Sequence, residues 1–123
     1  MTKQELIANY PTWFAAVREQ MEWGFSIGPG WLPMFTELCD LIATTQPPAD
    51  FHFVQIKEKF GLLRVYTRNG NMAIDTLIGY FEDKSGTVCE KCGSAENVET
   101  KGKGWIVTLC EKCRNVPQPE ANR

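Results

Sequence analysis

Two segments that both read C-E-K-C, Cys89–Cys92 and Cys110–Cys113, decide the fold of the C-terminal part of this 123-residue chain. Each segment places two thiols on one tight turn, and 17 residues separate the two pairs. A hairpin that brought the turns together would complete a tetrahedron of thiolates, which is the geometry of closed structural Zn²⁺ sites. Gly93 follows the first pair, where such a turn needs a positive φ. We therefore expect one structural Zn²⁺ bound by Cys89, Cys92, Cys110 and Cys113.

The residues between the two cysteine pairs alternate in the manner of β-strands. Asn97–Thr100 and Trp105–Leu109 flank a Lys-Gly-Lys-Gly turn at 101–104. A redox-active dithiol typically has one pair in a thioredoxin-like βαβ unit, and this region lacks that pattern. We predict a four-cysteine zinc ribbon over residues 86–114. Because a site closed by four cysteines has no open coordination position, its metal should hold structure and not catalyse.

Residues 1–85 combine helical and strand patterns, and the chain as a whole is expected to be α+β. Thr2 and Glu5 form a capping box that starts a helix through about Asn9, and Pro11 suits the first turn of a second helix to about Trp23. Two further helices are expected at 33–44 and 72–84. Their expected core residues are Trp13, Phe14, Val17, Met21, Met34, Phe35, Leu38, Leu41, Ile42, Ile74, Leu77, Ile78 and Phe81.

Between residues 51 and 68 the apolar period changes to two, which predicts a two-stranded sheet at 51–58 and 62–68. Val54, Ile56, Leu63 and Val65 would face the core. The opposite parity faces outward, and its candidate partner-binding residues are Phe53, Lys57, Lys59, Arg64, Tyr66 and Arg68. Such cations and aromatic rings could hold a phosphate backbone or an acidic patch of a protein. Alternatively, the cations only solubilise one sheet face, with Phe53 and Tyr66 under a helix.

The domain organisation that follows is a small helical and two-stranded-sheet domain over 1–85, a zinc ribbon packed against it over 86–114, and a flexible tail over 115–123.

The other residues that could carry chemistry have plainer structural interpretations. Cys39 is expected as a buried small hydrophobe, and His52 as a half-buried imidazole; a Cys–His dyad would require them to meet. The Gly24–Gly30 loop could hold an anion at the following helix but is favoured as a structural turn, with Trp31 in the core.

Two pairs of carboxylates stand at helical neighbour spacing, Glu19 with Glu22 and Glu37 with Asp40. Such pairs can bind Mg²⁺ or transfer protons. On amphipathic helices they are far more often solvated faces. No nucleophile with a base and an orienting group is evident, so no catalytic residue is assigned.

The charge and cysteine content narrow the function classes. The net charge is −2 with a pI near 5.4, which argues against a general nucleic-acid coat protein. Residues 1–83 carry 6 basic and 10 acidic side chains, whereas residues 84–114 carry 6 and 4. Four cysteines in metal spacing suggest a reducing compartment, and no apolar run has transmembrane length. We expect a cytoplasmic protein with no membrane partner.

Several segments occur together in an order that resembles a known family. They are Tyr10-Pro11, Trp23-Gly24-Phe25, Gly30-Trp31, Glu37-Leu38-Cys39, the K-E-K-F-G-x-L-R run from Lys57 to Arg64, and the ribbon with Gly104-Trp105 and Leu109-Cys110. The chain resembles a family of small proteins of tailed phages and bacterial genomes for which no activity is established. The resemblance implies an accessory protein of the bacterial host cytoplasm. In the Gly24–Gly30 loop the chain departs from its relatives, which often carry a cysteine and an acidic residue where Ile27 and Pro29 stand.

The function expected from the sequence is that of a non-enzymatic phage-type accessory protein that binds a host macromolecule and modulates or inhibits it. A host protein, such as a component of host defence, is the expected partner. The first alternative is a zinc ribbon protein that binds nucleic acid through the hairpin at 57–68 and the ribbon lysines. The second is a small hydrolase or nuclease that uses helix carboxylates, or Cys39 with His52.

Overall fold

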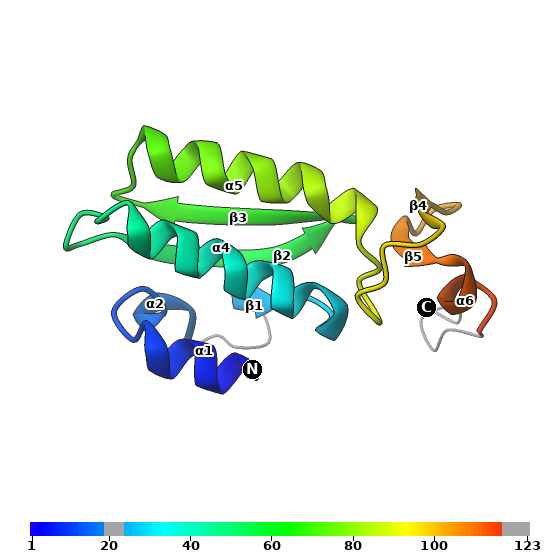
Figure 1. The fold of residues 1–123 in the computed structure, drawn as a ribbon, viewed down its shortest axis with the longest axis horizontal. Coiled ribbons are helices and arrows are strands. Elements are labelled where there is room, and N and C mark those ends of the chain that lie inside the picture. The colour runs from blue at the N-terminus through cyan, green and yellow to red at the C-terminus, as the bar shows by residue number, and fades with distance from the viewer. Residues whose placement is uncertain (19–23, 117–123) are drawn as a thin grey trace.

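The chain folds as an α+β protein with two small sheets (Figure 1). The structure is a computed structural model and describes residues 1–18 and 24–116. Its helices are α1 Lys3–Asn9, α2 Ala15–Arg18, α4 Leu32–Thr44, α5 Met72–Lys84 and α6 Glu111–Arg114, with 3₁₀ turns η1 Pro29–Trp31 and η2 Ser85–Thr87. Its strands are β1 Phe25–Ser26, β2 His52–Lys59, β3 Leu62–Arg68, β4 Val98–Lys101 and β5 Val107–Cys110. None of the described helices is both long and apolar enough to cross a membrane.

The helices begin where local hydrogen bonding predicts. The capping box of Thr2 and Glu5 is present at the start of α1, and Asn71 accepts the N–H of Ile74 at 2.9 Å at the start of α5. The second helix begins later than predicted, because residues 11–14 form turns before α2. Its predicted continuation through Met21 to Trp23, with the Glu19–Glu22 pair, lies outside the described residues.

The larger sheet has the order β1-β2-β3 and one more strand than the sequence predicts. β2 and β3 form the expected antiparallel hairpin, and its turn residues Phe60 and Gly61 have φ of 55° and 82°, as a tight hairpin turn requires. The addition is β1, which pairs in parallel with β2 through Phe25 opposite Ile56. A two-residue strand carries too little alternation to be recognised in a sequence.

A β-bulge corrects the predicted faces of β2. Phe53 pairs with Thr67, and Gln55 pairs with Tyr66, so Val54 is the extra residue between them. The extra residue reverses the parity of everything before it. Phe53 is therefore fully buried, and Val54 is 39% exposed. Our predictions of an outward Phe53 and an inward Val54 are both wrong, whereas Ile56, Leu63 and Val65 face the core as predicted.

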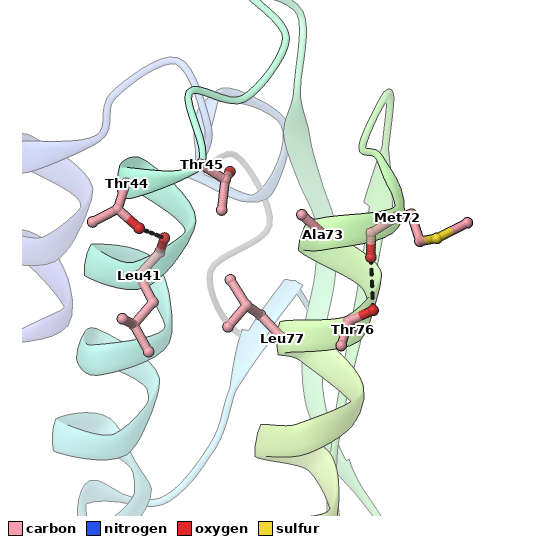
Figure 2. Close-up of a pocket in the computed structure, with 7 residues that line it drawn as sticks. All are labelled: Leu41, Thr44, Thr45, Met72, Ala73, Thr76 and Leu77. Atoms are coloured by element: carbon pink, nitrogen blue, oxygen red, sulfur yellow. Dashed lines mark hydrogen bonds between the residues drawn. The ribbon is translucent and has the colours of Figure 1, made fainter.

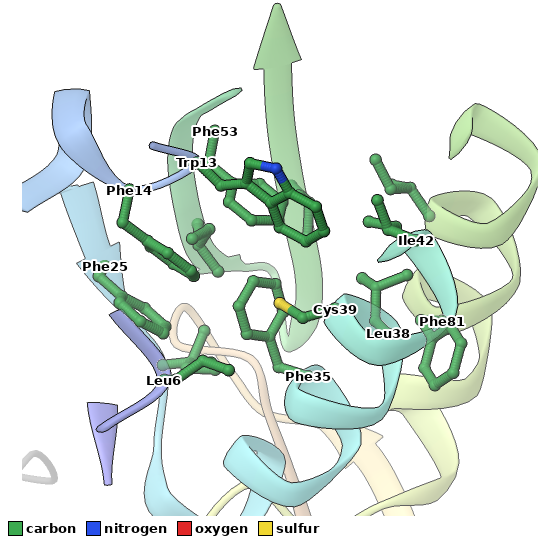
Figure 3. Packing of buried hydrophobic residues seen from close by; sticks show 14 of the residues in the cluster. Leu6, Trp13, Phe14, Phe25, Phe35, Leu38, Cys39, Ile42, Phe53 and Phe81 are labelled. Atoms are coloured by element: carbon green, nitrogen blue, oxygen red, sulfur yellow. The ribbon is translucent and has the colours of Figure 1, made fainter. Parts of the chain in front are cut away.

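The main core lies between the sheet and the helices that run alongside it, and it is rich in aromatic rings (Figures 1 and 3). Phe14 packs against Phe25 and Phe53, with ring centroids 5.5 and 5.0 Å away. Trp31 is fully buried, as predicted, and so is Cys39, whose thiol points into the cluster in Figure 3. Of the predicted core residues of the helices that the structure describes, Leu41 lies at the surface and Leu77 is partly buried; Met21 lies outside the described residues.

Candidate metal centre and binding face

The four cysteines converge as the sequence predicts. The sulfur atoms of Cys89, Cys92, Cys110 and Cys113 all lie within 4.8 Å of one another, and the Cys92 and Cys110 sulfurs are 3.7 Å apart. A metal with tetrahedral thiolates at about 2.3 Å requires sulfur–sulfur edges of about 3.8 Å. The cluster therefore has the size of a metal-binding tetrahedron, and it can hold one metal ion.

The two cysteine turns are positioned by local backbone geometry. Gly93 has the predicted positive φ, 83°, and its N–H donates to the carbonyl of Cys89 at 2.9 Å, which closes the first turn. The hairpin of β4 and β5 pairs Val98 with Cys110, and α6 begins directly after Cys110 to form the second turn. Each turn therefore presents its two thiols on one side.

Electrostatics within the cluster favour a cation. Burial raises the pKa of Cys89, but backbone hydrogen bonds from Cys110, Cys92 and Lys91 outweigh that effect and lower its pKa to about 6. Burial and hydrogen bonds with the other thiols raise the pKa of Cys113 to about 12. Four thiolates together therefore need positive charge nearby. A coordinated metal supplies it, because it deprotonates its thiol ligands outright.

The first cysteine turn is docked on the loop before α4. Glu90 accepts the N–H of Gly30 on its carbonyl at 2.7 Å and the N–H of Gly28 on its carboxylate at 2.9 Å. The indole of Trp31 donates to the carbonyl of Val88 at 2.7 Å. The N–H groups of Gly28 and Gly30 thus bind oxygen atoms of the chain's own Glu90, which makes the Gly24–Gly30 loop structural, as the sequence favours.

The ribbon also touches the β2–β3 turn. The hydroxyl of Thr108 donates to the carbonyl of Gly61, and a Cβ added at Gly61 would lie 2.8 Å from Thr100 and 3.1 Å from Ile106. The hairpin turn therefore rests directly on the small sheet. The contacts of the ribbon, residues 86–114, with the rest of the chain thus include the Gly28–Trp31 loop and Gly61, and Val88 packs against the main core.

The outer face of β2 and β3 carries cations and an exposed aromatic ring. Lys57 pairs across the strands with Arg64, and its ammonium group lies 5.7 Å from the centre of the Tyr66 ring. Lys59 and Arg68 are exposed. No described carboxylate forms an ion pair with any of these four cations. This set, Lys57, Lys59, Arg64, Tyr66 and Arg68, is called the cationic face below; Phe53 is removed from it because it is buried.

Both edges of this sheet are occupied. On the β3 edge, the N–H of Leu63 donates to the Ser85 hydroxyl at 2.9 Å and the N–H of Val65 to the Glu82 carboxylate at 3.0 Å. On the β2 edge, the N–H of Phe53 donates to the carbonyl of Trp13 at 2.8 Å, and β1 follows. A ligand at the cationic face would therefore meet side chains and not a free strand edge.

Of the remaining candidates in the described part of the chain, Cys39, His52 and Asp40 are not joined to one another by hydrogen bonds. Cys39 is fully buried, and that burial raises its thiol pKa well above the usual value. His52 is half-buried at the start of β2, with Nδ1 3.0 Å from the carbonyl of Asp50. Asp40 accepts the Tyr10 hydroxyl at 2.6 Å, which raises the pKa of Tyr10 to about 12. Asp40 and His52 therefore have structural partners, and Cys39 is enclosed in the apolar core.

A shallow apolar groove lies between α4 and α5 (Figure 2). Its volume is 580 Å³, and it is lined by Leu41, Thr44, Thr45, Met72, Ala73, Thr76 and Leu77. Figure 2 shows the hydroxyls of Thr44 and Thr76 turned to carbonyls of their own helices, at 2.6 and 2.9 Å. None of the lining side chains is titratable, so the groove offers no acid, base or metal ligand.

Sequence reasoning missed the residues that join the ribbon to the main sheet. Glu90 lies between Cys89 and Cys92. In the sequence it is taken for a spacer between two metal ligands, so its role in docking the ribbon is not recognised. The Gly-Pro-Gly segment at 28–30 was the available sequence signal of a close backbone approach. A Cβ at Gly30 would lie 2.2 Å from the carbonyl oxygen of Cys89, so glycine is needed there. The chain matches no family model, no curated protein and no solved structure. A proposal about its function is therefore based on the metal centre and the cationic face.

Proposed function

We propose that this chain is a non-enzymatic phage-type accessory protein that binds and modulates or inhibits a host protein in the bacterial cytoplasm. The observation that carries the proposal is the cationic face. Four cations share the outer face of β2 and β3 with one exposed tyrosine, and no described carboxylate pairs with them. Tyr and Arg are enriched among the residues that dominate protein interfaces. An unpaired cationic surface on a protein of net charge −2 has no evident folding role.

The metal in this proposal is a single structural Zn²⁺. An all-thiolate tetrahedron suits Zn²⁺ or iron, and a closed four-ligand set leaves no position for substrate. The ribbon core is small: Cys89, Leu109 and Cys110, with three partly buried neighbours. Such a unit depends on its metal to fold. The ion therefore supports the surface and takes no part in chemistry.

Nucleic acid is the second candidate partner, because the same cations and Tyr66 could hold phosphates and stack on a base. The salt dependence of binding distinguishes a nucleic-acid partner from a protein partner. Each neutralised phosphate releases counterion, so nucleic-acid binding falls steeply as salt rises. A protein partner should give a weaker salt dependence and a large loss with Tyr66→Ala.

The test is an affinity capture from bacterial host lysate with three tagged proteins: the wild type, Lys59→Glu/Arg64→Glu, and a control. The control, Arg18→Glu/Lys112→Glu, reverses two exposed cations that lie elsewhere on the chain. We expect a host protein that the wild type and the control retain and the hairpin variant loses. Equal capture by all three would refute the cationic face as the binding surface.

A further inference from the structure

The hairpin at 57–68 and the ribbon are in contact at the hairpin turn. Gly61, in the hairpin turn, lies against Ile106 and Thr108 of the ribbon. Phe60 precedes Gly61, and Trp105 precedes Ile106. Each of the two aromatic residues is therefore adjacent in the sequence to a residue of this contact.

Both flanking residues are exposed to an unusual degree for large aromatic side chains. Phe60 is 68% exposed and Trp105 is 49% exposed, while Tyr66 on the cationic face is 43% exposed. Lys59 lies 5.7 Å from the Phe60 ring centre, so the cations of the hairpin continue onto its turn. Lys103 adds an exposed cation at the ribbon tip. Exposed aromatic side chains next to charged residues are typical of interaction sites.

We propose that the cationic face, the Phe60 turn and the Trp105 tip form one continuous surface that takes an acidic protein segment with interspersed apolar side chains. This inference rests on the proposed function and names the chemistry of its partner. The cations would pair with carboxylates, and the three aromatic rings would take the apolar side chains. Because both edges of the sheet are occupied, the segment lies across the face and does not add a strand.

An acidic protein segment fits better than nucleic acid because of the charge of the whole chain. The net charge is −2 with neutral thiols, and four thiolates with one divalent ion make it about two units more negative. A polyanion as dense as nucleic acid is repelled at long range by such a protein. A short acidic segment within a folded partner carries less charge, and its apolar side chains add contacts that salt does not screen.

The surface has a length that a short peptide can span. The seven residues of β3 extend over about 24 Å at about 3.4 Å per residue, and the Phe60 turn lies at the end of this strand pair. An extended peptide of about 12 residues reaches about 40 Å. The test therefore uses a synthetic peptide of this length in which Asp and Glu alternate with Leu and Phe, added to the zinc-loaded full chain.

The measurement is an NMR titration of backbone amides and of the Trp105 indole N–H. We expect residues 57–68 and the 101–105 tip to shift together and to saturate with one apparent Kd. Phe60→Ala and Trp105→Ala should each weaken the peptide by about tenfold or more. Tyr80→Ala is the matched control, because Tyr80 is 61% exposed on α5 and lies outside the surface. It should leave the Kd unchanged.

Three outcomes would overturn the inference. They are shifts confined to one segment, separate Kd values for the two segments, or shifts from single-stranded DNA of similar length but not from the peptide. The spectra of the variants report whether each is folded, so a misfolded Trp105→Ala protein would be recognised. In that case the Kd of Phe60→Ala alone decides whether the continuous surface binds the peptide. If lysate capture is lost on reversal of Lys59 and Arg64 but is unaffected by Phe60→Ala and Trp105→Ala, the proposed function stands and the continuous surface is wrong.

Discussion

Replacement of Gly30 by alanine should undock the first cysteine turn from the rest of the fold. A Cβ at Gly30 would lie 2.2 Å from the carbonyl oxygen of Cys89, 2.5 Å from the nitrogen of Gly93 and 2.7 Å from the carbonyl carbon of Glu90. All three are backbone atoms, so no side-chain rotation relieves the clash. Gly30 is not among the residues with positive φ. The substitution therefore tests packing and not backbone conformation.

The magnitude follows from these distances. Ordinary contact begins near 3.4 Å, so the turn must retreat by about 1.2 Å from Gly30. The hydrogen bond from Gly30 to the Glu90 carbonyl would lengthen from 2.7 Å to about 3.9 Å and be lost. The neighbouring bond from Trp31 to Val88 would weaken with it. One lost hydrogen bond, one weakened hydrogen bond and residual strain together should lower the free energy of unfolding by about 2–4 kcal/mol.

The assay is urea unfolding of the zinc-loaded protein followed by circular dichroism, together with the rate of zinc transfer to a chromophoric chelator. Gly30→Ala should unfold at lower urea and release zinc faster. Gly79→Ala is the matched control: it lies in α5, and a Cβ there meets nothing within 4 Å. It should raise the free energy of unfolding by about 0.5–1 kcal/mol, because alanine is the better helix former. A Gly30→Ala protein with wild-type stability and zinc release would refute the docking argument.

Further expectations concern the cysteines, Glu90 and the cationic face. Elemental analysis should find one zinc per chain, lost in Cys110→Ser and retained in Cys39→Ala; zinc-free wild type purified without chelator would contradict this. Because burial raises its pKa, the Cys39 thiol should react slowly with thiol reagents in the native protein, and rapid labelling would argue against its burial. Burial also raises the pKa of Glu90, so its charged form is disfavoured in the folded state. Glu90→Gln should therefore be more stable than wild type at neutral pH, with the advantage shrinking as pH falls through the carboxyl range, and a constant difference across pH would show that ionisation is not the cause. Lys59→Glu/Arg64→Glu should melt within a few degrees of wild type, because Lys59 is exposed, Arg64 is partly exposed and surface charges contribute little to folding; a large drop in melting temperature would assign these residues a structural role.

Local sequence patterns were sufficient for the elements whose signals lie within a few residues. The capping box of Thr2 and Glu5 satisfies N–H groups of its own helix, so it predicts the start of α1 without any tertiary information. The two cysteine pairs are similarly local, since each turn orients its own thiols and one hairpin brings them together. The alternation in β3 holds because no bulge interrupts that strand.

Tertiary structure decided the features that depend on distant partners. The bulge at Val54 follows from burying Phe53 among the rings of Phe14 and Trp13, and one inserted residue reverses a strand's faces without leaving a trace in its composition. The pairing of β1 with β2 and the docking of Glu90 on Gly28 and Gly30 join residues that are 31 to 62 positions apart. Contacts at such separations are made only when the whole core assembles, so periodicity along the chain cannot encode them. The sequence thus determined which groups can bind metal and carry charge, and the assembled fold determined which of them face solvent together.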